Sequence, residues 1–520
     1  MTTLYRDGNV ITMDPAVGVV DAFLVRDGRF LAVGAEAHER AGDAEVVELE
    51  GRTVVPGLID AHTHLETSAI AERHWVDVRD LPLEQTLQRI AEHAERLPAG
   101  EWLIAQGTLG GHQAQNLPRR EILDEIVPDR PVIFRPSMHA CSANTIALER
   151  AGLFARSFSV PGAVIEREDG GVPTGRLWEA FHLFPIDRSD PAELADVLES
   201  HIRDHFSRYG VTTIYEVPMS REGMRAFQLL DDSHRLRARI GLNPAVKPGL
   251  QPLIDDVEQW AAFGIASGFG NDRLWLGAAK FFLDGAGSAA FDVHRDPDHP
   301  ARWGAPTRLY DDLVRSLVVG YESGIQFWIH AIGEGAQSFT IDAVREAQRL
   351  HGGDGGTRTR IEHVGTDFPV TPDMIERMRE ADITPVPTAA FMHFLPPGAS
   401  LPYRTLIAEG FRPPGNSDTA GSQPFATNPW FGVEKMLTRT NRFGQEVSAD
   451  ERVDLHQALR TYTEFAAYAG HREHDLGAIR VGALADFAVL TADPYRTPAD
   501  ELASIRSVRT VVGGDVVWEA

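Results

Sequence analysis

Apolar and polar positions alternate at both ends of the chain. Near the amino end, VITMD, DAFLVRDGRFLAVG and AEVVELEGRTVVPG alternate in this way between turn signals, which predicts short antiparallel strands. The same alternation returns near the carboxyl end, in ADFAVLTADP and SIRSVRTVVGGDVVWEA. We therefore expect residues 1–55 and 475–520 to form one composite β-sandwich beside a larger domain.

Between these ends, strand-like runs alternate with helical patterns, which is typical of repeated βα units. The predicted fold class is α/β, with a (β/α)8 TIM-type barrel over residues 56–474. The predicted strands are 54–64, 211–217, 237–246, 274–284, 325–333, 359–365, 383–390 and 415–421. The eighth is weak, because the preceding GFRPPGNSD has little apolar content.

Residues 68–200 do not follow the βα rhythm. We expect them to be an insertion after the first strand, where they would cover the mouth of the barrel.

Composition narrows the class of protein. A chain of 520 residues with 43% hydrophobic content can bury one large catalytic core and a smaller companion. It has no apolar run near twenty residues and no secretory pattern at its start, so we expect a cytoplasmic protein. The single cysteine, Cys141, excludes an intrachain disulfide and leaves imidazole and carboxylate as the usual metal ligands.

The formal net charge is -25 at pH 7, which would repel polyphosphate backbones and anionic membranes. We therefore expect no nucleic acid or membrane partner and a small, neutral or cationic substrate. A homo-oligomer is compatible with such a chain, but no symmetry is indicated.

His62 and His64 end the apolar run TVVPGLID. The period of a strand directs both side chains to one face, where they could converge on one ion. A His-x-His pair is a short motif, so its position at a strand end carries the argument.

Lys280 lies inside the apolar run LWLGAAKFFLD, in a chain with only three lysines among fifty basic residues. A buried ammonium is costly, but lysine, unlike arginine, can lose its proton when desolvated. A neutral amine can add carbon dioxide, and the resulting carbamate could bridge two metal ions. In the alternative, Lys280 pairs with a barrel carboxylate such as Asp284.

His330 ends the run IQFWIHAIG and His363 ends TRIEHVG, at the strand ends where a barrel places its working groups. Either histidine alone would more often be a hydrogen-bonded core residue. Together with His62 and His64 they form a candidate ligand set.

Asp418, in GNSDTAG, could act as general base and acid, taking a proton from the attacking water and passing it to the leaving nitrogen. The alternative is an Asx-turn in a loop rich in Gly, Asn and Ser. The local sequence leaves both open.

These residues resemble the amidohydrolase superfamily, in the branch of large amidohydrolases that includes N-substituted formamide deformylases and exoenzyme-regulatory proteins. The resemblance spans nearly the whole chain. It rests on VVPGLIDAHTHL, GAAKFFLDGAGS, IHAIGEGA, RIEHVG and NSDTAGSQPFATNPWFGVEKMLTR, and extends to HACSANTIAL, VPTGRLWEA and VGALADFAVL.

The resemblance implies zinc or another divalent metal, as one or two ions. Its ligands would be His62, His64, His330 and His363, with Lys280 as a carboxylated bridge. Asp418 would be the catalytic base and acid. The substrate would meet His139 and Glu179 from the insertion, and Asp284 after the fourth strand.

The chain also departs from the family pattern. GEGA replaces the more usual Gly-Asp after His330, and NSD replaces Gly-Ser-Asp before the weak eighth strand, which could displace Asp418. QGTLGGHQAQN stands where the family usually has a Gly-Trp motif, which favours an unusual substrate.

The leading hypothesis is a metal-dependent hydrolase that cleaves a non-peptide carbon–nitrogen bond, in an amide, formamide or related compound. One alternative is a cyclic amidase or deaminase that uses the same groups. Another is a catalytically silent ligand-binding or regulatory protein, for which the weak eighth strand is the motive.

Overall fold

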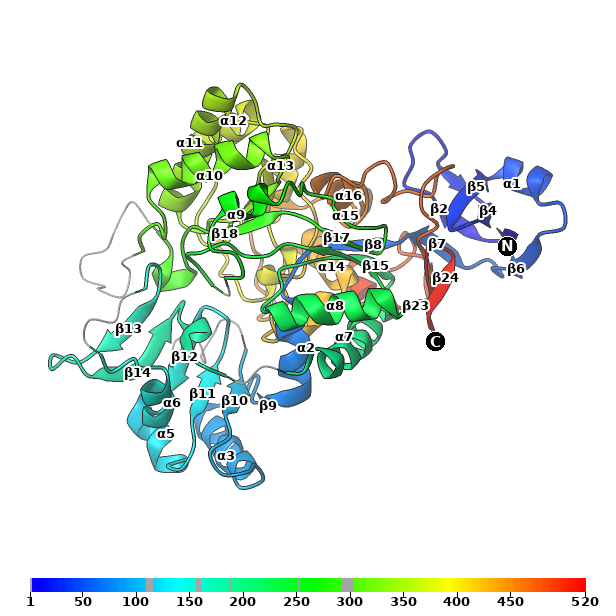
Figure 1. The fold of residues 1–520 in the computed structure, drawn as a ribbon. Helices are drawn as coiled ribbons and strands as arrows, with labels where there is room; N and C mark the ends of the chain where they lie inside the picture. Colours follow the sequence, from blue (N-terminus) through cyan, green and yellow to red (C-terminus); the bar gives the residue numbers. More distant parts are fainter. Residues whose placement is uncertain (1, 109–115, 156–159, 187–188, 251, 292–303) are drawn as a thin grey trace.

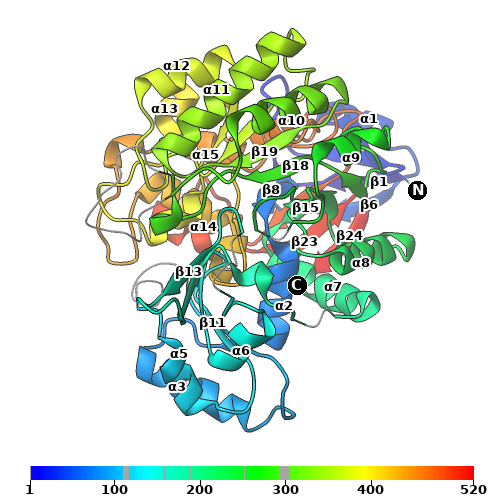
Figure 2. The same cartoon turned by 60° about the vertical axis from the view of Figure 1, so that its left-hand side comes forward.

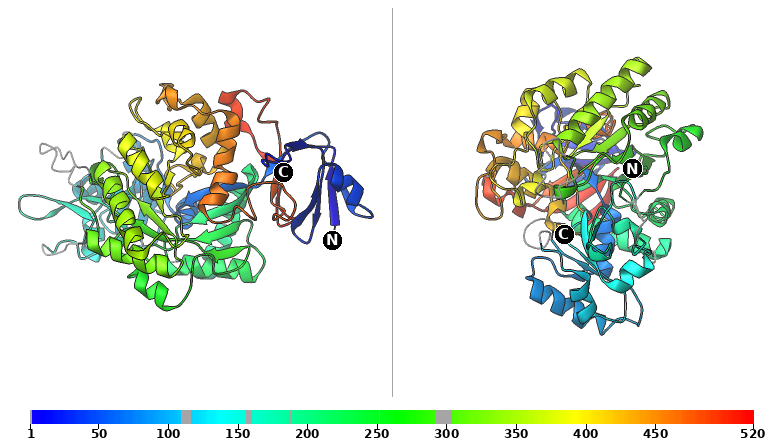
Figure 3. Two further views of the ribbon diagram at one scale, coloured as in Figure 1. Left: turned by 90° about the horizontal axis from the view of Figure 1, so that it is seen from above. Right: turned by 90° about the vertical axis from the view of Figure 1, so that its left-hand side faces the viewer.

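The computed structural model describes the whole chain except residues 1, 109–115, 156–159, 187–188, 251 and 292–303. Its chain ends lie together in a small β unit at one side of the molecule, beside the larger body (Figure 1). Seen from above, the same unit projects from the body (Figure 3).

Two sheets make up the small unit. The first has the order β5-β4-β1-β6, with bounds Arg29–Val33, Phe23–Arg26, Thr2–Arg6 and Glu45–Glu48, and carries helix α1 (Ala35–Arg40). The second has the order β24-β23-β22-β7-β2-β3, with bounds Asp515–Glu519, Ser507–Val512, Phe487–Leu490, Thr53–Pro56, Asn9–Ile11 and Val19–Val20. Strands from both chain ends therefore share one sheet, and Phe23, Phe30 and Phe487 pack together in the core of the unit.

The expectation of antiparallel strands throughout this unit is wrong at two places. β1 pairs in parallel with β6, and β2 pairs in parallel with β7. Other elements lie between the two strands of each pair along the sequence, so neither pair is a hairpin.

Parallel strands form the centre of the larger body. One sheet has the order β17-β16-β15-β8, with bounds Leu274–Leu276, Arg239–Leu242, Val211–Glu216 and Leu58–Thr63. The other has the order β18-β19-β20-β21, with bounds Ala279–Phe282, Phe327–His330, Arg360–Glu362 and Thr384–Val386. A parallel bridge between Ala245 and Lys280 joins the two sheets. This α/β arrangement agrees with the strand order expected for the barrel.

The predicted strand 274–284 is divided into β17 and β18. At the break, the side-chain oxygen of Asn243 accepts a hydrogen bond from the backbone N–H of Ala278 at 2.7 Å. A Cβ on Gly277 would stand 2.3 Å from that oxygen, so only glycine leaves room for the inserted side chain.

The predicted eighth strand has no regular strand geometry, because GNSDT supplies polar side chains and follows two prolines. It nevertheless runs beside β8. Ala61 N–H donates to the carbonyl of Gly415 (3.1 Å), Asp418 N–H to that of His62 (2.9 Å), and His64 N–H to that of Thr419 (2.9 Å). These backbone bonds fix the segment against the first strand despite its composition.

Helices surround the two parallel sheets (Figure 2). Their bounds are α2 Leu65–His74, α7 Pro191–His205, α8 Arg221–Asp232, α9 Val257–Ala262, α10 Tyr310–Glu322, α11 Glu334–His351, α12 Pro372–Glu380, α13 Tyr403–Ala408, α14 Pro429–Thr438, α15 Leu455–Thr461 and α16 Glu464–Ala469. Several begin at caps that the sequence encodes, such as Asp190 before Pro191 and the capping box of Asp454 with Gln457.

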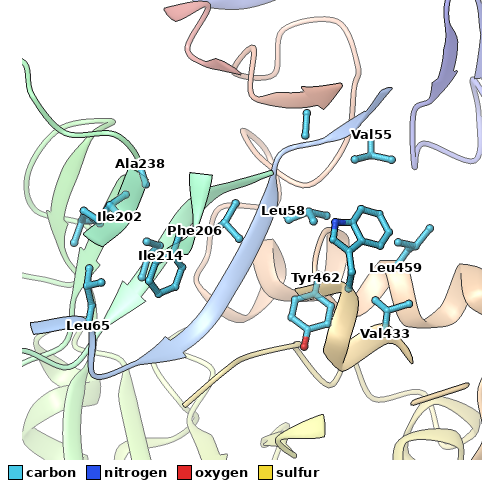
Figure 4. Packing of buried hydrophobic residues seen from close by; sticks show 14 of the residues in the cluster. Val55, Leu58, Leu65, Ile202, Phe206, Ile214, Ala238, Val433, Leu459 and Tyr462 are labelled. Atoms are coloured by element: carbon cyan, nitrogen blue, oxygen red, sulfur yellow. The ribbon is translucent and has the colours of Figure 1, made fainter. Parts of the chain in front are cut away.

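The core between helices and strands is apolar. Figure 4 shows Leu58 and Ile214 from adjacent strands with Ile202 and Phe206 of the α7 region, and Tyr462 beside Val433. This packing fixes the strands whose ends carry the site.

Residues of the predicted insertion form a lobe with its own six-stranded sheet, of order β13-β14-β12-β11-β10-β9. The strands are Val164–Arg167, Pro173–Trp178, Ala140–Ala143, Val132–Arg135, Leu103–Gln106 and Val76–Asp77, and the helices include α3 (Leu83–Ala94), α5 (Arg120–Ile126) and α6 (Thr145–Arg150). We call this part, residues 76–183, the inserted lobe. Helix α7, which falls within the predicted 68–200, packs instead on α2 and α8 of the larger body.

Candidate functional site

The predicted ligands gather where the parallel strands end. His62 lies on β8 and His64 directly after it, Lys280 lies on β18, His330 is the last residue of β19, and His363 follows β20. All five side chains are buried. Since the carboxyl ends of parallel strands meet at one edge, five positions spread over 300 residues come together there.

The distances define a compact cluster. His62 Nε2 lies 3.0 Å from Lys280 Nζ, and the His62 ring centroid lies 5.5 Å from that of His64 and 5.1 Å from that of His363. The rings of His363 and His330 are 4.7 Å apart. Among the described residues no ion pair joins Lys280 to Asp284, whereas the carboxylates of Glu362 and Asp418 both raise the pKa of Lys280 against the effect of burial.

Asp418 joins this cluster directly. Its carboxylate oxygens lie 3.5 Å from His64 Nε2, 3.7 Å from His62 Nε2 and 3.8 Å from His363 Nδ1. One ligand atom each from His62, His64 and Asp418 all lie within 4.8 Å of one another, close enough to share a metal ion. The sequence pointed to Asp418 only as a base and acid, whereas its position also makes it a candidate ligand.

Burial sets the protonation states of the cluster. It lowers the pKa of His62, His64, His330 and His363 well below the usual 6.5, so these imidazoles are neutral and have lone pairs to offer. Burial also lowers the pKa of Lys280 to about 8 and raises that of Asp418 to about 7. A neutral amine is therefore accessible near neutral pH, as the carbamate hypothesis requires.

Several buried atoms of the cluster have no hydrogen-bond partner. They are His64 Nδ1, both ring nitrogens of His330, His363 Nδ1 and Asp418 Oδ1. Unsatisfied buried polar atoms are costly, and a cation would take up the one lone pair that each neutral imidazole offers and a lone pair of the carboxylate. The donor set of imidazoles and a carboxylate suits zinc and similar divalent ions.

A second layer of charged residues orients His62. Its Nδ1–H donates to Glu362 Oε2 at 2.6 Å, which leaves the Nε2 lone pair facing the cluster. Arg360 in turn donates to both oxygens of Glu362, each at 2.9 Å, and its guanidinium stacks 3.6 Å from the Trp328 ring. Neither Glu362 nor Arg360 is among the residues predicted from the sequence. The signal was present as RIE, two opposite charges inside a short buried strand.

The segment that carries Asp418 is fixed from both sides. Asp60 Oδ1 accepts from the Ser417 N–H at 2.9 Å, and Arg135 of the inserted lobe donates to the Ala420 carbonyl at 3.2 Å. Asp418 itself has φ of 45°, a left-handed conformation that costs a non-glycine residue about 1–3 kcal/mol unless its surroundings hold it. The sequence suggested that the weak eighth strand could displace Asp418, but in the structure Asp418 lies beside His62 and His64.

His139 and Glu179 lie together beside the cluster, on the inserted lobe. His139 Nδ1 is 3.0 and 3.1 Å from the two oxygens of Glu179. The His139 ring centroid is 5.4 Å from that of His330. Burial lowers the pKa of His139, but the carboxylates of Glu179 and Asp418 raise it, so the net pKa lies above the usual 6.5.

Asp284 lies at the same end of the strands, buried beside the cluster. Its oxygens accept from the backbone N–H groups of Phe291 (2.9 Å), Ile332 (3.1 Å) and Gly333 (2.9 Å), and one lies 3.7 Å from His330 Nε2. These contacts tie the loop after β18 to the loop after β19. A direct contact between Asp284 and a substrate stays a prediction.

The QGTLGGHQAQN segment, for which an unusual substrate was expected, includes residues 109–115, which lie outside the described residues. The part of the chain that the structure describes contains no helix long and apolar enough to cross a membrane.

A parallel-stranded α/β body with this cluster at its strand ends has the ligand types that can hold a divalent cation and activate water. The chain belongs to the amidohydrolase family, which residues 45–518 match. It is 29% identical to an N-substituted formamide deformylase of Arthrobacter pascens, over 99% of this chain and 97% of that protein. It is 25% identical to the exoenzymes regulatory protein AepA of Pectobacterium carotovorum subsp. carotovorum, over 67% of this chain and 77% of that protein.

Solved structures share the fold. A metal-dependent hydrolase from Pyrococcus horikoshii OT3 superimposes with a TM-score of 0.73 at 20% identity, over 96% of this chain and 99% of that one. The resemblance inferred from the motifs is thus confirmed at the level of the family. Family membership supports a hydrolase that acts on carbon–nitrogen bonds.

Proposed function

We propose that this protein is a metal-dependent hydrolase that cleaves the carbon–nitrogen bond of a small amide, formamide or related compound. The observation that carries the proposal is the set of buried, unpartnered ligand atoms on His64, His330, His363 and Asp418. A protein without a cation there would leave these atoms unsatisfied in its interior.

The residues that would hold one or two divalent ions, zinc among them, are His62, His64, His330, His363, Lys280 and Asp418. A bound cation would supply Lewis acidity, polarising the substrate carbonyl and lowering the pKa of water. Glu362 supports this role because it fixes the His62 ring with the Nε2 lone pair toward the cluster.

Lys280 would be present as its carbamate. The neutral Nζ would form a bond to the carbon of carbon dioxide, one C=O electron pair would move to oxygen, and the proton released from nitrogen would pass to solvent. The product carries one negative charge, which suits a position among neutral imidazoles beside cations. The pKa of about 8 supports a population of neutral amine near neutral pH.

Asp418 would move the proton during the reaction. Its carboxylate has two oxygens, so while Oδ1 faces His62 and His64, Oδ2 can accept a proton from the attacking water. The same oxygen would then donate this proton to the departing nitrogen, since an unprotonated amine anion is a very poor leaving group.

We also propose that the parallel sheets close as a (β/α)8 barrel, with residues 415–421 in the eighth position. The backbone bonds of this segment to β8 support closure on one side. On the other side, Asn416 donates to the Pro387 carbonyl at 3.0 Å. Residues 1–55 with 475–520 would be the composite sandwich domain, and residues 56–474 the hydrolase domain.

A panel assay tests the proposal. Purified protein is analysed for bound metal and then incubated with amides, formamides and lactams, before and after chelation. We expect release of an amine that stops on chelation and returns with zinc. Cleavage of lactams alone would favour the cyclic amidase alternative. A metal-loaded protein that hydrolyses no member of the panel would contradict the proposal.

A silent regulatory protein is less well supported. Its motive was a displaced Asp418, and this residue instead lies 3.5–3.8 Å from three histidines.

A further inference from the structure

A recess of about 300 Å³ lies where the small β unit meets the larger body. Three separate parts of the chain line it: residues from 9–19, which contain β2 and β3, then His456 on α15, and the turn that carries Asp493 and Tyr495. Small-molecule sites are often of this size and often lie between domains. We call this feature the junction recess.

The junction recess is separate from the predicted metal ligands. Asn9 of β2 is the register partner of Thr53 in β7, and β7 leads directly into the amino end of β8. His62 lies near the carboxyl end of β8, so the length of this strand separates the recess from the cluster. A ligand in the recess would therefore leave the proposed metal site open.

The walls of the junction recess are largely apolar. Ile11 and Met13 line it and are almost completely buried. Val19 also lines it but is 63% exposed, because β3 is an edge strand with only β2 beside it. A ligand with an apolar part would cover this surface, and its removal from water favours binding.

Two carboxylates give the junction recess a negative charge. Asp493 Oδ1 accepts from the Tyr495 N–H at 2.9 Å, and its Oδ2 accepts from Asn9 Nδ2 at 3.3 Å, so the side chain is held in place. Asp14 Oδ1 accepts from the Ala16 N–H at 2.9 Å, while among the described residues its Oδ2 accepts no hydrogen bond. Each carboxylate keeps lone pairs that a ligand can use.

No lysine or arginine is among the described residues that line the junction recess. Arg496 contacts Asp493 from outside, with Nε 3.4 Å from Oδ2, and its side chain is 88% exposed. Exposed ion pairs of this kind contribute little free energy, so a cationic ligand can replace this one with little loss. The recess therefore favours a cation and disfavours an anion.

Tyr495 adds an aromatic ring to the junction recess. Its hydroxyl lies 3.2 Å from Nδ1 of His456, and this contact ties the ring to α15. Aromatic rings attract organic cations through the negative charge of their faces. Carboxylates, an aromatic ring and apolar walls are thus combined in one recess.

We propose that the junction recess binds a small organic ammonium ion. The charged group lies at Asp14 and Asp493, and the apolar part packs on Ile11, Met13 and Val19. A bare metal ion fits less well, because it needs several oxygen ligands in close contact and gains nothing from apolar walls. The proposal does not rest on the proposed hydrolysis, since neither the cluster nor turnover enters it.

Calorimetric titration of the full-length, metal-loaded protein tests the proposal. The probe is cyclohexylammonium chloride at about pH 8, where an alkylamine is protonated. We expect one equivalent to bind with a Kd below about 1 mM. Cyclohexanol has the same ring without the charge, and cyclohexanecarboxylate has the opposite charge; both should bind at least about tenfold more weakly. The ammonium ion alone should raise the thermal unfolding temperature, because it binds the folded chain.

Three variants locate the ligand. Asp14→Asn and Asp493→Asn each remove one charge and should weaken binding by about tenfold or more. Val19→Trp fills the recess from an exposed position on the edge strand and should abolish binding while both charges remain. Asp43→Asn, at an exposed carboxylate of the small β unit outside the recess, is the matched control and should bind like the wild type. If Asp493→Asn fails to fold, the other two variants carry the test.

Asp418→Asn distinguishes the recess from the cluster and should also bind cyclohexylammonium like the wild type. The proposal is overturned if the wild type binds no cyclohexylammonium at about 10 mM. It is also overturned if cyclohexanol binds equally well, because the carboxylates then play no part. Binding that is lost in Asp418→Asn but kept in the recess variants would overturn it too, since the ion would then lie at the cluster.

Discussion

Glu362 Oε2 lies 2.6 Å from His62 Nδ1, although 300 positions separate the two residues in the chain. Both are fully buried, and Arg360 closes the other side of the carboxylate with two hydrogen bonds. The pair connects β8, which carries His62, with β20, which carries Glu362. It determines the tautomer of His62, a predicted metal ligand, and should therefore affect the affinity of the site for metal.

We expect Glu362→Gln to weaken metal binding by about 10–100-fold, because a neutral amide is a weaker acceptor for His62 than the carboxylate and leaves the Arg360 guanidinium without this counter-charge. The measurement is a zinc titration against a competing chelator. Glu376→Gln, on the exposed side of α12, is the control and should bind like the wild type. Equal affinity in the Glu362 variant would mean that the second layer does not tune the site.

Lys280 should carry the added carbon dioxide. With ¹³C-bicarbonate, we expect a carbamate resonance in the wild type that is absent in Lys280→Arg, since a guanidinium does not lose its proton. The Arg variant should also lose bound metal on elemental analysis. Lys247→Arg, at an exposed lysine, should keep both signals. Two equivalents of metal retained by Lys280→Arg would remove the bridging role.

Asp418→Asn should abolish most turnover while the fold persists. An amide cannot accept the proton of the attacking water, so we expect kcat to fall by about 10²–10⁴-fold. Steady-state kinetics on metal-loaded protein measure this, with Asp373→Asn on the surface of α12 as the control. Turnover within about tenfold of the wild type would assign the proton transfer to another residue.

Metal affinity should rise with pH. Asp418, with a pKa of about 7, is mostly protonated at about pH 6, and Lys280, with a pKa of about 8, carries its proton there. Cation binding needs the ionised carboxylate and the neutral amine. At low pH a cation must displace the protons of both groups before it binds, whereas at about pH 9 few of these protons remain. The imidazoles add little, because burial keeps them neutral across this range.

The measurement is zinc affinity at several pH values. Asp418→Asn should flatten part of the slope. An affinity that does not change between about pH 6 and pH 9 in the wild type would contradict these protonation states.

Asp486 links the small β unit to the parallel sheets through a buried ion pair. Arg239 donates to its two oxygens at 2.7 and 2.8 Å, and the Gly513 N–H donates to it at 2.7 Å. Asp486→Asn leaves the guanidinium without a counter-charge, so we expect the free energy of unfolding to fall by about 3–5 kcal/mol. Chemical denaturation measures this. Asp515→Asn, at an exposed partner of Arg273, should change stability by less than about 1 kcal/mol.

Periodicity predicted the positions of the parallel strands and the histidines at their ends, because burial on both faces imposes a continuous apolar run. The opposite charges in the buried strand RIE could have singled out Glu362, but not its contact with His62. That contact, and the position of Asp418 beside the histidines, depend on which strands become neighbours, and for Asp418 the polar loop carries no local signal. The eighth segment also escaped pattern analysis, since its position comes from backbone bonds to β8 and from Asp60.

The inserted lobe shows the same limit from another side. The absence of a βα rhythm identified this lobe as separate. The pairing of its sheet is parallel from β9 to β11 and antiparallel beyond, and the alternation of apolar and polar residues does not predict the direction of pairing.

Strand β7 lies between β2, which precedes it in the chain, and β22, which follows it only after the whole parallel-stranded body. Until residues 487–490 emerge, one edge of β7 has no strand to pair with, and an open edge invites pairing with other chains. A chain from which residues 487–490 are missing or not yet synthesised therefore exposes a strand edge that the folded sheet covers, so aggregation is expected to depend on whether this late segment has reached β7.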